Sequence, residues 1–395
     1  MINSKPMKKI NVILAALMLC GLMTGCGGSG GSNTSTSADT PAGINITLKA
    51  EGEVEILLGI SGENAATINW GDGSPVDSIT LNPSYKGYWH TYNQTSEYIV
   101  TITGENITTL WCDDMKITNL ELNIHTLTEL YCGSSQLTAL DLSNCPKLLI
   151  LNCENNQLTT LDLSKNPTLQ DLNCDKNNLT GLDLSKNPAL EKLSCCHNQL
   201  TTLEMSTNTK LKELICVSNQ ITSLDVSKNT ALERFDCGKN QLTTVDVSKN
   251  TALTAFGCSA NQLKSVNINA NTALVELACV GNQLTTLDLH TNTALKWIYC
   301  DSNQLISLDL SGNDALLTII LTNNQLTTLD VSTNHNIIYL DCQKNQLSED
   351  ALNALFHTLR STDGNIIIGA NPGTDDCDRS IASKKGWKVM KEYRD

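Results

Sequence analysis

One spacing constrains this chain more than any other feature: cysteines recur every 21 residues through its middle. They stand at positions 132, 153, 174, 195, 216, 237, 258, 279 and 300. Leu321 takes the next position, Cys342 the one after it, and Cys112 precedes the first by 20 residues. Self-similarity at a fixed period of this length indicates stacked repeats, each of which contacts only its neighbours. The spacing therefore predicts a solenoid of about 12 coils over residues 105–347.

Most repeats carry a leucine two residues before the cysteine position, as in Leu214-Ile215-Cys216. Successive side chains of a strand point to opposite faces, so Leu214 and Cys216 are expected inside and Ile215 outside. Neighbouring coils would then pair as parallel strands, roughly 4.8 Å apart. An asparagine three residues after the cysteine position, such as Asn219, also recurs. Its amide is expected to satisfy buried backbone groups where the chain turns out of the strand.

The cysteines of this column are expected to be small buried hydrophobic residues. Eleven of the 16 cysteines occupy the column. Their Cβ vectors would be parallel, which turns the sulfurs away from disulfide geometry. Short C-x-x-C spacing is absent from the column, so no zinc site is expected. Outside it lie Cys145, Cys377 and Cys196, and we expect Cys196 to point outward because it follows the inward Cys195.

The repeat resembles a known sequence family. The unit of residues 211–231 reads LKELICVSNQITSLDVSKNTA. It resembles the leucine-rich repeat in its 21-residue bacterial form, whose second half reads L-x-x-L-D-L-S-x-N. The resemblance implies a β-rich solenoid with parallel strands. It also implies an adhesin-like or host-contact role of the internalin type, in which the concave face binds another protein.

Two smaller units are predicted to flank the solenoid. Residues 42–104 alternate apolar and polar residues in short runs separated by turn residues, which predicts a small antiparallel β-sandwich. Its Trp70-Gly71-Asp72-Gly73 and His90-Thr91-Tyr92 segments resemble the PKD-like domain of bacterial surface proteins, and we expect Asp72 and His90 to form turns and hydrogen bonds. Residues 348–395 are predicted to form a small α/β cap, with a helix that begins after Ser348.

The first residues are predicted to form a targeting signal and not to be part of the fold. Lysines precede an apolar run from Ile10 to Leu22, which is too short to span a bilayer and is typical of a signal peptide. The run ends in Leu22-Met23-Thr24-Gly25-Cys26, which resembles a bacterial lipobox. The resemblance implies cleavage after residue 25 and lipidation of Cys26. Residues 26–41 have the composition of a flexible linker.

Composition excludes several classes of function. The chain has 41 acidic and 27 basic residues and a net charge of −14, which argues against nucleic-acid binding. It contains no P-loop, H-E-x-x-H or G-x-S-x-G motif, and its six histidines are scattered over different repeats. We therefore expect no enzyme activity, no cofactor and no metal.

The positions that face outward on the predicted front strand vary between repeats and suggest where a ligand binds. Trp297, Tyr299, Ile320 and Tyr339 are expected to cluster on the concave sheet near the C-terminal end, and Trp and Tyr are common interface anchors. Acidic outward residues, among them Glu213, Asp236 and Glu276, favour a partner with some positive charge. A second pair, Trp111 and Tyr131, lies at the opposite end and is expected to pack on the β-sandwich.

These features together predict a lipid-anchored envelope protein that binds a protein partner without catalysis. The anchor would make it an outer-membrane lipoprotein on the bacterial surface, attached to the membrane by lipid only. A carbohydrate-capturing surface lipoprotein is the alternative, because exposed Trp and Tyr rings also stack on sugars. The two hypotheses differ in whether the ligand is a protein or a surface glycan.

Overall fold

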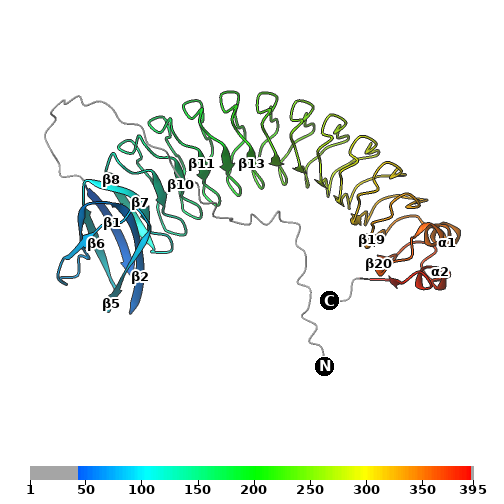
Figure 1. The fold of residues 1–395 in the computed structure, drawn as a ribbon, viewed down its shortest axis with the longest axis horizontal. Helices are drawn as coiled ribbons and strands as arrows, with labels where there is room; N and C mark the ends of the chain where they lie inside the picture. The colour runs from blue at the N-terminus through cyan, green and yellow to red at the C-terminus, as the bar shows by residue number, and fades with distance from the viewer. Residues whose placement is uncertain (1–42, 393–395) are drawn as a thin grey trace.

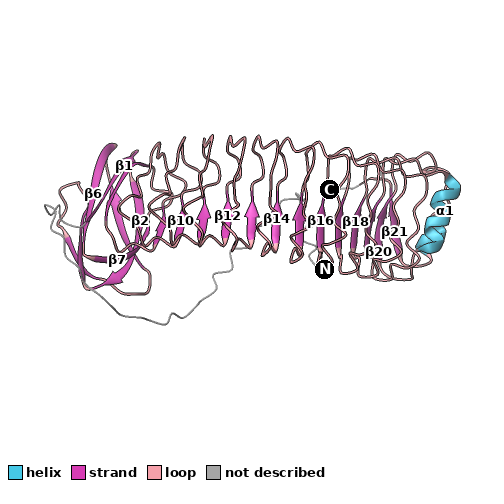
Figure 2. Ribbon diagram, turned by 90° about the horizontal axis from the view of Figure 1, so that it is seen from above, coloured by secondary structure: helices cyan, strands magenta, loops and turns pink. Residues whose placement is uncertain are grey.

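The computed structural model describes residues 43–392 as a curved solenoid with a β-sandwich at its N-terminal end. The solenoid forms an arch whose short strands line the inner, concave side (Figure 1). A helix closes the C-terminal end (Figure 2). The predicted signal peptide, Cys26 and the linker lie outside the described residues. Among the described residues, no helix is long and apolar enough to cross a membrane.

The β-sandwich packs two sheets around a core that includes Ile44, Ile46 and Trp70. One sheet has five strands in the order β4-β3-β6-β1-β8. They are β1 (Gly43–Ala50), β3 (Ala65–Asn69), β4 (Asp77–Thr80), β6 (Ser96–Thr103) and β8 (Ile117–Asn123). The facing strands are β2 (Val54–Glu63), β5 (Lys86–Tyr92) and β7 (Asn106–Trp111). Because β7 and β8 follow residue 104, the first predicted coil of the solenoid also contributes a strand to each sheet of the sandwich.

The second sheet of the sandwich continues without a break into the solenoid. Its 16 strands run in the order β21-β20-β19 through β9-β7-β2-β5. Strand β7 makes the junction, since it pairs antiparallel with β2 and parallel with β9. The coil strands are β9 (Glu129–Tyr131), β10 (Ile150–Asn152), β11 (Asp171–Asn173), β12 (Lys192–Ser194), β13 (Glu213–Ile215), β14 (Arg234–Asp236), β15 (Ala255–Gly257), β16 (Glu276–Ala278), β17 (Trp297–Tyr299), β18 (Thr318–Ile320) and β19 (Tyr339–Asp341).

The interior of the coils confirms the predicted inward columns. Leu214 and Cys216 are fully buried, whereas Ile215 is only partly covered. All cysteines of residues 43–392 are buried and free. Asn219 donates from Nδ2 to the carbonyl oxygens of Cys195 and Cys216, at 2.9 and 3.2 Å, and its Oδ1 accepts from the Leu200 N–H. The amide therefore ties two neighbouring coils together at the point where strand pairing stops.

The C-terminal segment continues the parallel sheet of the solenoid and also covers the end of its core. Helix α1 (Glu349–Thr358) begins after Ser348, whose side chain accepts a hydrogen bond from the Ala351 N–H. Its buried face, with Leu352, Leu355 and Phe356, joins the continuous core of the solenoid. Strands β20 (Gly364–Ile367) and β21 (Trp387–Met390) then add to the sheet in parallel, with the short helix α2 (Ser380–Ser383) between them.

Candidate functional site

The four predicted apolar anchors come together on the concave sheet near its C-terminal end. Trp297 and Tyr299 lie two residues apart on β17, so they share one face. Tyr299 lies directly opposite Ile320 of β18, and Thr318 separates Trp297 from Tyr339 of β19. All four side chains are partly exposed, so the cap leaves them accessible. We call these four residues the concave aromatic cluster.

The predicted acidic residues lie on the same concave face as this cluster, and a basic residue lies among them. Glu276 is directly opposite Trp297. Further along the face, Arg234 lies directly opposite Glu213, and its Nε is 3.5 Å from the Glu213 Oε1. Asp236 lies over Gly257, where an added Cβ would come within 2.6–2.8 Å of the carboxyl atoms. The small residue at 257 thus makes room for the Asp236 carboxyl group.

Carboxyl groups on the two sides of the solenoid have opposite pKa shifts. Burial raises the pKa of Asp236 to about 6, and it also raises the pKa of Glu276. On the outer edge, the carboxylates of Asp162 and Asp225 accept hydrogen bonds from the backbone N–H groups of Ser164 and Ser227, and these bonds lower both pKa values. The concave carboxyl groups are therefore poorly solvated, so a cationic partner would compensate the cost of their ionisation.

We expect Asp236→Asn to raise the free energy of unfolding by about 1 kcal/mol at pH 7 and to have little effect near pH 4. The pKa of Asp236 is raised on folding, so the folded chain holds the proton more tightly than the unfolded chain. Stability is therefore lost as the pH rises from about 4 toward 6. An asparagine keeps an oxygen for the Gly238 N–H but carries no charge. Urea unfolding at both pH values measures the difference.

Asp225→Asn is the matched control from the preceding coil. Its pKa is lowered by the Ser227 N–H, so its charge is favoured in the folded chain and its removal should bring no gain at pH 7. Equal shifts in both variants would contradict the assignment of Asp236 as a poorly solvated group.

Cys196 lies outside the inward column, as strand alternation predicts, but its thiol is covered and not accessible. Its side chain is 8 % exposed, and burial raises the pKa of the thiol to about 12. The Asp175 carboxylate of the preceding coil covers it, because that carboxylate accepts hydrogen bonds from the Cys196 N–H at 2.6 Å and from the Ser194 hydroxyl at 2.7 Å. Cys145 and Cys377 are buried and free as well.

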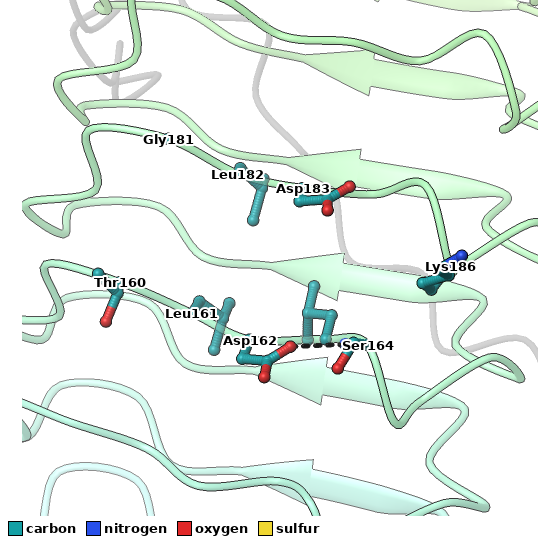
Figure 3. A pocket seen from close by; sticks show the side chains of 9 residues that line it. Thr160, Leu161, Asp162, Ser164, Gly181, Leu182, Asp183 and Lys186 are labelled. Carbon is teal, nitrogen blue, oxygen red and sulfur yellow. Dashed lines mark hydrogen bonds between the residues drawn. The ribbon is translucent and has the colours of Figure 1, made fainter.

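A depression of about 410 Å³ lies on another side of the solenoid, between two neighbouring coils (Figure 3). Asp162 and Asp183 line it together with Gly181 and Lys186. Gly181 has open space where a Cβ would lie, and the corresponding position of the preceding and following coils is threonine. The hollow thus includes the open space at Gly181, where the two neighbouring coils carry a threonine side chain.

In the β-sandwich, Asp72 and His90 make the structural contacts that were predicted. The His90 Nε2 lies 2.8 Å from the Asp72 Oδ2, and its ring stacks on Trp70 with centroids 4.6 Å apart. Within residues 43–392, no group of three or more His, Cys, Asp or Glu side chains is arranged to hold a metal ion.

The prediction for Trp111 is confirmed in part, and two exposed aromatic residues were not anticipated. The Trp111 ring contacts Tyr85 of the β-sandwich but stays 43 % exposed. Tyr85 and Trp89 are also exposed and lie at the same end of the molecule. Both follow Pro83 in a segment whose alternation is weak, and only the pairing of β5 with β2 shows which face they share.

Comparison with solved structures identifies bacterial proteins of the same architecture. The functional domain of InlJ from Listeria monocytogenes, described as including a cysteine ladder, is 34 % identical, with a TM-score of 0.64 over 70 % of this chain. The chain covers 66 % of that domain, slightly less than two thirds. A leucine-rich-repeat protein of Leptospira interrogans is 25 % identical, with a TM-score of 0.60 over 67 % of this chain and 72 % of that one.

Another internalin of Listeria monocytogenes, InlF, is 21 % identical, with a TM-score of 0.66 over 73 % of this chain and 87 % of that one, and supports the fold alone. The sequence matches no protein-family model and no curated protein. The parallel sheet, the cysteine column and these similarities all indicate the same fold. The chain therefore has the leucine-rich-repeat solenoid fold, in the form found in internalin-like bacterial proteins.

Proposed function

We propose that this chain is a binding protein of the bacterial cell envelope, anchored by lipid at Cys26, and that its concave face recognises a protein partner. The concave aromatic cluster carries the proposal. Trp and Tyr are the residues that most often anchor protein interfaces, and here two of them lie beside each other on one rigid strand. Interface anchors on regular strands are held in place before binding, which reduces the entropy lost on association.

The acidic residues beside the cluster indicate the charge of the partner. Glu213, Asp236 and Glu276 share the face with two bases, Lys192 and Arg234, so carboxylates predominate there and favour a partner that presents basic side chains. Glu276 borders the cluster directly, since it lies opposite Trp297. A lysine or arginine of the partner could contact Glu276 while a neighbouring apolar residue contacts the indole ring.

We expect the double substitution Trp297→Ala and Tyr299→Ala to weaken partner binding at least tenfold, because truncated aromatic anchors dominate binding energy. Both side chains are partly exposed, so the thermal midpoint should stay nearly unchanged. The full chain serves as bait against surface proteins, and each captured protein is titrated against the wild type and the double variant.

Ile306→Ala provides the control, since Ile306 is 56 % exposed, apolar and outside the concave strands of the same region. It should leave both binding and the midpoint intact. If binding and the midpoint fall together in the double variant, the two aromatic residues are structural and the binding face lies elsewhere.

The proposed location on the cell surface has its own test. Protease treatment of intact cells that express the full chain should cut the solenoid if it faces outward. A solenoid that survives until the envelope is broken would contradict the adhesin-like role and would direct the search to partners inside the envelope.

A further inference from the structure

A second aromatic surface lies at the junction of the β-sandwich and the solenoid, at the opposite end of the sheet from the concave aromatic cluster. Trp89 is 63 % exposed, Tyr85 47 % and Trp111 43 %. Among the described residues, these are the aromatic side chains with large exposure. Apolar side chains gathered on an exposed face usually mark a contact surface.

Strand pairing places these residues on one continuous face. Trp89 of β5 lies opposite Leu57 of β2, and two residues further along β2 lies Gly59, opposite Trp111 of β7. Trp111 in turn lies opposite Tyr131 of β9. The row therefore runs across four neighbouring strands, from the sandwich into the first coils. We call Tyr85, Trp89, Trp111 and Tyr131 the junction platform.

Gly59 makes room for the Tyr85 ring on this face. An added Cβ on Gly59 would overlap the Tyr85 ring, whereas one on Gly87 would come within 2.7 Å of the Leu57 Cδ1. The ring is therefore laid over the backbone of β2 and reaches Trp111. The centroids of Tyr85 and Trp111 are 5.3 Å apart, and those of Trp111 and Tyr131 are 5.6 Å apart. Successive ring planes are tilted by 50° and 35°, so the platform is twisted along its length.

Carboxylates flank the rings on both sides. Asp113, on one side, accepts hydrogen bonds from the Trp111 side chain and from the Gly133 N–H, and these bonds orient the indole ring. Glu129, on the other side, accepts a hydrogen bond from the Tyr131 hydroxyl at 3.4 Å. No Lys or Arg occupies an outward position of β2, β5, β7 or β9, as the described pairing defines these positions. The surface thus combines aromatic faces with hydrogen-bond acceptors and repels anions.

We propose that the junction platform binds a neutral oligosaccharide, whose sugar rings stack on Tyr85, Trp111 and Tyr131. One face of a pyranose ring is lined by C–H groups and packs on an aromatic face, while its hydroxyl groups point sideways and donate to flanking carboxylates. The spacing between the aromatic centroids is comparable with the length of one sugar residue in an extended chain. The negative charge disfavours glycans that carry uronic or sialic acids. This site is separate from the protein-binding face of the proposed function and does not depend on it.

The test is a titration of the full chain with cellohexaose, maltohexaose and a hexamer of galacturonic acid, followed by calorimetry and tryptophan fluorescence. We expect saturable binding of a neutral hexaose and none of the anionic one. Trp111→Ala should weaken the binding about tenfold, whereas Trp111→Phe should retain most of it because the aromatic face remains. Ile99→Ala is the control, since Ile99 is 55 % exposed on β6, in the other sheet of the sandwich.

Two results would overturn the proposal. One is that neither neutral hexaose binds at concentrations up to about 10 mM, which corresponds to negligible affinity. The other is that Trp111→Ala binds the hexaose as well as the wild type at an unchanged thermal midpoint. Failure of the protein-binding proposal would be seen separately, because that depends on Trp297 and Tyr299. If Trp111→Ala impairs capture of a protein while no hexaose binds, the platform is part of the protein-binding face instead.

Discussion

Asn240→Ala is expected to lower the free energy of unfolding by about 1–3 kcal/mol. The Asn240 side chain accepts from the Ile221 N–H at 3.0 Å and donates to the carbonyl oxygens of Cys216 and Cys237, at 3.0 and 3.1 Å. Alanine leaves the buried Ile221 N–H without a partner, at a cost of about 1–3 kcal/mol, whereas the carbonyl oxygens of Cys216 and Cys237 still accept from Asn219 and Asn261. Urea unfolding followed by circular dichroism measures the loss.

Gln241→Ala is the matched control, because it removes an exposed amide from the adjacent position. Its effect should stay within about 0.5 kcal/mol. Amide hydrogen exchange adds a local readout: the Ile221 N–H should lose its protection in Asn240→Ala, while distant coils keep theirs. Equal stability of the two variants would mean that water or a rearranged turn satisfies the Ile221 N–H, and the asparagine column would then not hold the coils together.

Phe356→Ala is expected to cost about 3–5 kcal/mol, the range for truncation of a buried phenylalanine. Phe356 is fully buried in helix α1, within the core that the cap shares with the last coils. Because each unit of a solenoid contacts only its neighbours, the loss should be concentrated at the C-terminal end. Hydrogen exchange should show α1, β20 and β21 opening first, and the unfolding transition should broaden.

The neighbouring His357→Ala supplies the comparison, since His357 is exposed on the same helix. It should leave stability nearly unchanged. If Phe356→Ala leaves the exchange of β19 and β20 unaltered, the C-terminal segment does not protect the end of the solenoid, and its proposed role as a cap is wrong.

The asparagine column is predictable from the sequence only as far as the 21-residue period extends. The spacing of the column predicts its burial through Asn345, because identical residues at a fixed period occupy equivalent places in every coil. Asn371 continues the column, and its Oδ1 accepts from the Leu347 N–H at 3.2 Å. It follows Asn345 by 26 residues, so the 21-residue period does not reveal it. Its role depends on α1, which lengthens the chain between two coils.

The charges on the concave face are likewise only partly predictable from the sequence. Outward positions of the acidic residues follow from strand alternation, and so does their proximity on neighbouring coils. The raised pKa of Asp236 depends on burial, and that burial arises because Gly257 of the next coil lets the carboxyl group lie down on the sheet. Cys196 is the contrary case: alternation puts it outside, but the Asp175 carboxylate covers it.

By itself, the sequence determined the solenoid, its inward leucine and cysteine columns and the outward residues of the concave face. A period of 21 residues repeated over many coils leaves one consistent way to bury the apolar side chains. Only the tertiary structure decided that the β-sandwich and the solenoid share one sheet, because β2 and β7 are distant in sequence and no periodicity connects them. It alone placed Tyr85 over Gly59 and beside Trp111, since that contact requires close packing between strands that no local pattern encodes.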